Sequence, residues 1–221
     1  MPTADEFYSQ SQRKIQKEHD SHNLADAVVA AIVSDELQDE QIEFISKLDY
    51  FFLSTVNRNG EPTVSYKGGP VGLVNVVSPR KLVFPNYDGN GMFLSMGNAT
   101  ETGKIGMLFI DMETPLRVRV QGTAKVSENP ELLALFPGSN MVVEVAVTAV
   151  FYNCARYIHK HQRIENSRYV PNEKGEQPFP AWKRINLLQE VLQPKDIGRA
   201  EQEGGTISIE EYDQKVQEGT S

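Results

Sequence analysis

The stretch from Gly60 to Gly122 constrains the fold more than any other part of the chain. Segments rich in Val, Leu and Phe alternate here with two loops dense in Gly, Asn, Ser and Lys, KGGPVG and DGNGMFLSMGN. About seven short strands at close spacing, with one short crossover helix, favour a barrel over a dinucleotide-binding sheet. Loops with exposed amides beside such strands are typical of an anion site, although the second loop, residues 88–98, is equally consistent with a turn and a short connecting helix. The sequence therefore predicts a small β-barrel that holds an anionic ligand.

The expected elements follow from the spacing of apolar and turn residues. Asn57-Arg58-Asn59-Gly60 predicts a hairpin turn, because Asn-Gly supplies the positive backbone angles that such turns need. Arg117 and Arg119 alternate with valines, so one face of that strand carries cations and the other enters the core. Strands are expected at residues 50–57, 63–67, 72–77, 81–85, 104–111, 116–126 and 141–152, and a short helix at 130–136.

The two ends of the chain differ in character from the middle. Residues 1–48 are predicted to form a helical segment that packs on the barrel, with one helix starting near Ser34 or Asp35. The barrel itself is assigned to residues 49–163 and a C-terminal extension to 164–195, in which residues 182–192 suit a helix. Residues 196–221 are acidic and poor in large apolar side chains, which favours a flexible tail.

Composition argues against several classes of partner. Of the 221 residues, 22 are Lys or Arg and 30 are Asp or Glu, which gives a formal charge of 22 − 30 = −8. An acidic chain has little general affinity for nucleic acid or for an anionic membrane, so neither partner is expected. The single cysteine, Cys154, fits a reducing compartment, and the first residues lack the basic-then-apolar order of a signal peptide. We therefore expect a soluble, cytoplasmic protein.

The residues that carry chemistry indicate ligand binding rather than catalysis by side chains. Lys67 ends a predicted strand just before Gly68-Gly69, where its ammonium group could reach a phosphate or could simply be solvated. His19 and His22 have no third partner for a metal, so no metal site is expected. No acid, base or nucleophile stands out, and the catalytic residues stay unknown. An anion site without catalytic side chains suggests that a cofactor performs the chemistry.

Three blocks follow one another in a specific order along the chain. They are FISKLDYFFLSTVNRNGEPTVSYKGGPVGLVNV, LVFPNYDGNGMFLSMGNATETGKIGMLFID and LRVRVQGTAKV, and NCARYIH follows the last predicted strand. Their order resembles that of the pyridoxamine 5′-phosphate oxidase-related FMN-binding proteins, over residues 35–154. The resemblance implies a mainly β fold with flanking helices, the FMN-binding split β-barrel, with six strands. It also implies a homodimer with one FMN in each of two grooves at the interface.

The resemblance further implies which residues bind the cofactor. Lys67 would reach the phosphate of FMN, Phe84 and Pro85 would run beside the cofactor, and Arg117 would contact it from a neighbouring strand. Loop residues would hold phosphate and ribityl oxygens, and residues of the second subunit would close the groove. The implied set is Val64, Ser65, Tyr66, Lys67, Phe84, Pro85, Asn90, Ser95, Asn98 and Arg117, with Arg156, Tyr157 and Trp182 from the second subunit.

One departure from the family pattern bears on activity. Pyridoxamine 5′-phosphate oxidases carry an adjacent Arg-Lys pair in the phosphate loop and a basic C-terminus, whereas this loop offers Asn, Ser and Gly and the C-terminal region is acidic. The difference disfavours oxidation of pyridoxamine phosphate and leaves FMN binding intact. The sequence thus predicts an FMN-dependent oxidoreductase that acts on an unidentified small molecule. The alternatives are a non-catalytic flavin-binding or redox-sensing module, and a related barrel that binds haem or a deazaflavin.

Overall fold

The structure is a computed structural model that describes residues 2–221. The chain divides into two compact units. The larger unit comprises Met1–Asn166 and Val170–Gly175, and the smaller one comprises Ser167–Tyr169 and Glu176–Ser221. The larger unit contains the sheet and the candidate site, so its construction is described first.

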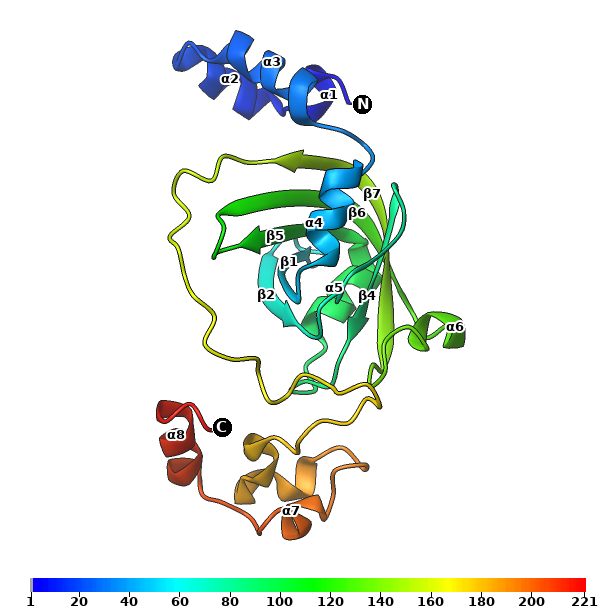
Figure 1. Ribbon diagram of the computed structural model, residues 1–221, viewed down its shortest axis with the longest axis vertical. Helices are drawn as coiled ribbons and strands as arrows, with labels where there is room; N and C mark the ends of the chain where they lie inside the picture. The colour runs from blue at the N-terminus through cyan, green and yellow to red at the C-terminus, as the bar shows by residue number, and fades with distance from the viewer. Residues whose placement is uncertain (1) are drawn as a thin grey trace. The chain divides into compact units, whose positions relative to one another are not determined.

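A single seven-stranded antiparallel sheet forms the centre of the larger unit (Figure 1). Its order is β2-β1-β5-β6-β7-β4-β3, so the hairpin β1–β2 lies at one edge and the hairpin β3–β4 at the other. The strands are β1 (Tyr50–Val56), β2 (Pro62–Gly68), β3 (Asn75–Ser78), β4 (Lys81–Asn86), β5 (Lys104–Asp111), β6 (Leu116–Ser127) and β7 (Met141–Tyr152).

Most predicted strands are confirmed to within two residues at each end, and one is shorter than predicted. The strand expected at residues 72–77 begins at Asn75, because Gly72 adopts a left-handed φ of 79° and its N–H donates to the carbonyl oxygen of Leu48. The sheet has one strand more than the six that the family resemblance implies. The helix expected at residues 130–136 is a single turn, α6 (Pro130–Leu133).

The apolar core lies on the inner face of the curved sheet. Phe51, Phe84 and Phe109 meet there, with ring centroids 5.1 Å apart for Phe51 and Phe84 and 5.4 Å apart for Phe51 and Phe109. Helix α4 (Asp39–Ser46) adds the fully buried Ile45 to the same cluster. On β6, Val118 is buried as the alternating pattern predicts. The period-two pattern therefore fixes which side of each strand enters the barrel.

The junction of β6 and β7 requires glycine at position 122. A bulge between Gln121 and Gly122 shifts the register of the two strands. A Cβ at Gly122 would lie 2.6 Å from Val145 Cγ1 and 2.7 Å from the backbone oxygen of Ala146. Because the second of these contacts is with backbone, it cannot be relieved by rotating a side chain, and the strands can approach this closely only at a glycine.

Three helices precede α4: α1 (Ala4–Phe7), α2 (Gln10–Glu18) and α3 (His22–Ile32). Val29 of α3 and Val33 just after it form an apolar cluster with Ala149 and Phe151 of β7. The helix expected to start near Ser34 begins instead at Asp39. Ser34 forms a two-way backbone bridge with Val150 (3.0 and 2.7 Å), and this pairing holds the chain extended at Ser34.

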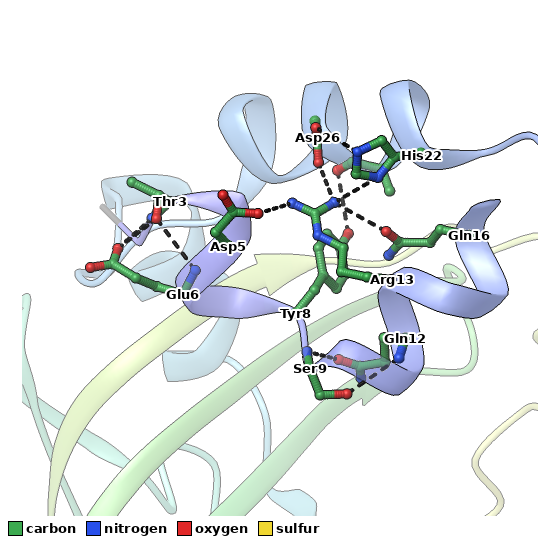
Figure 2. A network of polar contacts seen from close by, with 11 residues as sticks. Thr3, Asp5, Glu6, Tyr8, Ser9, Gln12, Arg13, Gln16, His22 and Asp26 are labelled. Carbon is green, nitrogen blue, oxygen red and sulfur yellow. Dashed lines mark hydrogen bonds and ion pairs between the residues drawn. The ribbon is translucent and has the colours of Figure 1, made fainter.

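Arg13 joins the three N-terminal helices to one another (Figure 2). Its guanidinium group donates to Asp5 Oδ1 at 2.8 Å, to Gln16 Oε1 at 3.1 Å and to Asp26. It also lies 5.0 Å from the centre of the Tyr8 ring. The two carboxylates raise the pKa of Arg13, and its side chain is only 14% exposed. This network therefore stabilises α1–α3 as a folded segment.

The smaller unit is built from short helices around a small apolar cluster. Ile185 pairs with Ile207 and packs with Trp182, and a buried ion pair joins Lys183 Nζ to Asp196 Oδ2 at 2.6 Å. The predicted helix at 182–192 is interrupted at Ile185 by this pairing. The elements are the 3₁₀ turns η1 (Ala181–Arg184) and η2 (Asn186–Val191), and the helices α7 (Arg199–Gln202) and α8 (Ile209–Gln217).

The region expected to be a flexible tail forms secondary structure. Ser208 and Glu211 make a reciprocal capping box that starts α8, and such a box defines a helix start even in an acidic segment. Asp196 pairs with Lys183, so residues on both sides of the expected boundary at 195–196 belong to one compact unit. Low apolar content does not predict flexibility in this segment, because a few buried side chains are enough to hold it folded.

Candidate functional site

A cleft of about 390 Å³ opens beside β2 in the larger unit. Its walls are strand β2, the end of β4, the loop that follows β4, and the first turn of α5 (Leu94–Thr102). Of the sequence-predicted cofactor residues, seven line this cleft: Val64, Ser65, Tyr66, Lys67, Pro85, Asn90 and Ser95. Residues far apart in the sequence thus converge on one cavity, whose size is within the range of small-molecule sites.

Strand β2 presents two different faces. Thr63, Ser65 and Lys67 alternate on a partly buried face, whereas Val64 and Tyr66 are 69% and 62% exposed on the other. The exposed Tyr66 ring stacks on Tyr50 of β1, with centroids 5.4 Å apart and planes at 17°, and burial raises the pKa of Tyr66. The alternation therefore separates a polar row that faces the helix from an apolar row that faces outward.

Helix α5 lies along the polar row of β2. Its Ser95 hydroxyl is 3.2 Å from that of Ser65. One turn later Asn98 Nδ2 donates to Thr55 Oγ1 at 3.1 Å, and a further turn on, Thr102 Oγ1 donates to the carbonyl oxygen of Val56 at 2.7 Å. Followed along the helix from Ser95 to Thr102, these contacts run from the middle of β2 back towards the turn of the hairpin, so α5 runs against the direction of β2. Its amino end is directed towards the next residue of the polar row, Lys67.

Two sources of positive potential line the same cleft. The first is the amino end of α5, where no side chain caps the helix and the amides of Leu94, Ser95 and Met96 have no intrahelical acceptor. The second is Lys67, the only cationic side chain among the described residues that line the cleft. Amides and a cation in this arrangement suit a phosphate group.

The protein supplies no counter-charge to Lys67. Within residues 2–221, its ammonium group forms no hydrogen bond and no ion pair. Burial lowers the pKa of Lys67, because a half-buried ammonium group loses hydration that nothing in the protein replaces. A cation left in this condition is electrostatically complementary to an anionic ligand.

The loop between β4 and α5 is shaped by its own side chains. Asn90 Oδ1 accepts the N–H of Met92 at 3.1 Å, which turns the chain back towards the helix. Phe93, at the N-cap, has a left-handed φ of 48°, an unfavourable conformation for a bulky residue. Met92, Phe93 and Leu94 are all substantially exposed at the rim of the cleft. Asn90 therefore organises the loop, and the rim beside the anion site is apolar.

The remaining predicted residues do not line the cleft. Phe84 is fully buried in the barrel core, and Asn98 is buried under the helix at 6% exposure. Arg117 Nη2 donates to the carbonyl oxygen of Cys154 at 2.7 Å. Arg156 and Tyr157 are exposed on the segment after β7. In the smaller unit, Trp182 packs in the local apolar cluster. A role for Arg156, Tyr157 or Trp182 in a second subunit stays a prediction.

Several residues at or beside the cleft escaped the sequence-based prediction. Thr63 shares the polar face of β2, and the alternation in TVSYK is the signal that identifies it. Tyr87 follows β4 at the cleft wall, where burial raises the pKa of its hydroxyl. Thr55 of β1, which supports α5, carries a fully buried hydroxyl. Nothing in the local sequence marks Thr55, because its partner is distant in the chain.

Comparison with protein families gives one match. The model for pyridoxamine 5′-phosphate oxidase matches residues 37–165, which is more than half of the chain and includes every strand. The chain belongs to the pyridoxamine 5′-phosphate oxidase family. Membership confirms the predicted fold class, a mainly β split barrel with flanking helices. No curated protein matches the sequence.

Several solved structures resemble between about half and two thirds of the chain. A proposed pyridoxamine 5′-phosphate oxidase from Lactobacillus delbrueckii is 26% identical, with 53% of this chain and 95% of that chain covered and a TM-score of 0.44. The haem storage protein HutZ from Vibrio cholerae is 16% identical, with 53% and 94% covered and a TM-score of 0.41. An FMN-binding protein from Syntrophomonas wolfei is 16% identical, with 66% and 96% covered and a TM-score of 0.38.

Membrane-spanning helices and metal-binding clusters are both absent from the described residues. Among residues 2–221, no helix is both long enough and apolar enough to cross a membrane. In the same residues, no three His, Cys, Asp or Glu side chains are grouped so that they could hold a metal ion.

Proposed function

We propose that the protein binds FMN in the cleft beside β2 and uses it as the redox cofactor of an oxidoreductase for a small molecule. The observation that carries the proposal is the half-buried Lys67, which has no counter-charge within residues 2–221 and lies where the uncapped amino end of α5 is directed. FMN is a dianion of suitable size for a cavity of about 390 Å³. Family membership adds independent support for a flavin.

The residues of the cleft fit the parts of such a ligand. Lys67 would hold the phosphate as a point charge, and the amides of Leu94, Ser95 and Met96 would donate to its oxygens. Ser65 and Ser95 would supply hydroxyl donors between the helix and β2. When bound, FMN would supply hydride or electron transfer. The protein would hold and orient the cofactor, and the apolar rim at Met92 and Phe93 would limit access of water.

The proposal includes a homodimer. Val64 and Tyr66 leave an apolar row exposed on β2, an edge strand of the sheet, and Val71 just beyond it is 69% exposed. Large exposed apolar side chains beside a ligand cleft are typical of a surface that another protein covers. A second copy of the chain would bury this row and would complete the cofactor groove with Arg156, Tyr157 and Trp182. A cytoplasmic location is part of the proposal and is supported by the exposed free thiol of Cys154.

Pyridoxamine phosphate is not the proposed substrate. Lys67 is the one cation among the described lining residues, and it is assigned to the phosphate of FMN. Within one subunit the cleft offers no second cation for a substrate phosphate, in agreement with the missing Arg-Lys pair of the loop, and Arg156 of the second subunit is assigned to closing the groove around the cofactor. We therefore assign the enzyme to a substrate that carries no phosphate group.

The absorption spectrum of the purified protein tests the proposal. A yellow protein with two visible flavin bands, or a colourless one that acquires them when FMN is added, supports it. A Soret band would indicate haem instead, and failure to bind added FMN would overturn the proposal. Anaerobic addition of NADH or NADPH then separates an enzyme from a binding module, because only a turnover-competent flavin should bleach and recover its colour with an acceptor.

A further inference from the structure

A line of polar side chains fixes helix α5 to the β1–β2 hairpin. Asn98 Nδ2 donates to Thr55 Oγ1 at 3.1 Å and contacts Thr63 Oγ1 at 3.5 Å, and the two threonine hydroxyls are 2.9 Å apart. Ser95 and Thr102 extend the line in either direction along the helix, towards Ser65 and the carbonyl oxygen of Val56. The helix is thus tied to the hairpin at successive turns on one face.

Asn98 and Thr55 are placed beneath the cleft rather than in its wall. Asn98 is 6% exposed and Thr55 is fully buried, and neither lines the cavity. A buried amide must be hydrogen-bonded to avoid a large desolvation cost, and the threonine hydroxyls satisfy the Nδ2 group of Asn98. The amide is therefore committed to contacts inside the protein.

Helix α5 does not need the Asn98 amide in order to pack against the barrel. Met96 and Ala99 of α5 are already buried against the barrel core, at 4% and 2% exposure. Apolar contacts tolerate sliding, whereas a hydrogen bond fixes the relative position of its donor and acceptor to a few tenths of an ångström. The polar link therefore determines where α5 stops along β2, and with it the distance between the first helical amides and Lys67.

We infer that Asn98 is a positioning residue, which acts through Thr55 and Thr63 to set the amino end of α5 against Lys67 and thereby confers selectivity for phosphorylated over unphosphorylated flavin. The inference rests on the proposed function and goes beyond it. It replaces the expectation that Asn98 touches the cofactor. A displaced helix would weaken the amide contacts with the phosphate and would leave contacts with the flavin ring and ribityl chain unchanged.

Titration of the full-length protein with FMN and with riboflavin tests the inference. The ratio of the two dissociation constants is measured for the wild type, Asn98→Ala and Thr55→Val. Thr55→Val is nearly isosteric and removes only the buried hydroxyl. Both variants should reduce the preference for FMN about fivefold and leave riboflavin affinity unchanged, as expected for the loss of one hydrogen bond. The double variant, Asn98→Ala with Thr55→Val, should lose no more of the preference for FMN than either single variant, because both substitutions remove the same hydrogen bond.

Thr100→Val is the matched control. Thr100 is exposed on the same helix, and its hydroxyl donates only within the helix, to the carbonyl oxygen of Met96 at 2.9 Å. The same chemical change at this position should leave the preference for FMN intact. Thermal unfolding of each variant establishes that the barrel is folded before the titrations are compared.

Each other outcome has a definite meaning. Equal loss of FMN and riboflavin affinity would show a merely structural role and would overturn the inference, as would an unchanged preference in both variants. Loss in Asn98→Ala without loss in Thr55→Val would mean that Asn98 contacts the ligand directly, which also overturns it. A wild type that binds neither flavin, or does not prefer FMN, refutes the proposed function itself.

Discussion

Replacement of Lys67 by Met should change stability and ligand affinity in opposite directions. Lys67 is half-buried with no counter-charge within residues 2–221, and burial lowers its pKa. A charged lysine therefore opposes folding of the ligand-free protein at neutral pH, since the unfolded chain hydrates the ammonium group fully. Met keeps a similar apolar stem without the charge. We expect Lys67→Met to raise the melting temperature of the ligand-free protein and to weaken FMN binding.

The burial of Lys67 gives an estimate of how much FMN affinity the Lys67→Met variant should lose. A hydrogen bond to a charged partner contributes about 1.5–3 kcal/mol. Lys67 is only partly buried, and solvent screening places its contribution in the lower part of that range, at about 1.5–2 kcal/mol. This corresponds to a loss of FMN affinity of about 10- to 30-fold. Riboflavin affinity should not fall, because riboflavin has no phosphate.

The pH dependence has a definite sign. The pKa of Lys67 is lower in the folded protein than in the unfolded chain. Between these two pKa values the unfolded chain holds the proton and the folded protein does not. The stability of the ligand-free protein therefore rises with pH over this range. FMN affinity should fall as pH rises through the lowered pKa, since the neutral amine no longer attracts the phosphate. Lys67→Met should lose both dependences, and Lys67→Arg should keep the charge and most of the affinity.

Flavin fluorescence titrations and thermal unfolding measure both quantities on the same preparations. A Lys67→Met protein that melts at a lower temperature would mean that the ammonium group has a stabilising partner. An unchanged FMN affinity would remove Lys67 from the phosphate site. Either result would refute the reasoning, because both expected effects derive from one uncompensated charge.

Substitutions in β6, at the start of α5 and in the N-terminal helices test the fold of the larger unit. Gly122→Ala should lower the unfolding free energy by about 2–3 kcal/mol because its Cβ would meet backbone, whereas Gly106→Ala, with its nearest neighbour at 3.8 Å, should be tolerated in the same denaturation assay. Phe93→Gly should be about 1 kcal/mol more stable than Phe93→Ala, since only glycine adopts a left-handed φ without cost; equal stabilities would contradict this. Arg13→Met should speed amide exchange in α1–α3 and leave exchange in β1 unchanged, because Arg13 links the three helices to one another; uniform exchange across the chain would contradict it.

The sequence predicted the barrel well because its strands are defined locally. The strands at 104–111 and 141–152 were predicted with the observed bounds, since apolar alternation and turn residues coincide there. The alternation in β2 also encodes the polar row that faces the cleft. Family membership depends on the order of these blocks and was visible in the sequence as well.

The features that the sequence left open or missed depend on distant partners. Helix α5 contains Gly97 and Asn98, both poor helix formers, and contacts with the β1–β2 hairpin decide its conformation. Ser34 was expected in a helix and is extended, because it pairs with Val150. Asn98 was assigned to the ligand because an Asn in a glycine-rich segment resembles a loop donor. Only the structure shows that its amide is directed into the protein.

The charge of the whole protein makes the geometry of the cleft decisive. A chain with a formal charge of −8 repels a phosphate at long range, so attraction must come from groups within a few ångströms. Lys67 acts through a flexible stem and tolerates small shifts, whereas the amides of α5 act only in position. The two contributions share no side-chain partner, so the FMN affinity losses of Lys67→Met and Thr55→Val should multiply, with free energies additive to within about 0.5 kcal/mol. A double variant no weaker than Lys67→Met alone would mean that α5 contributes nothing to phosphate binding.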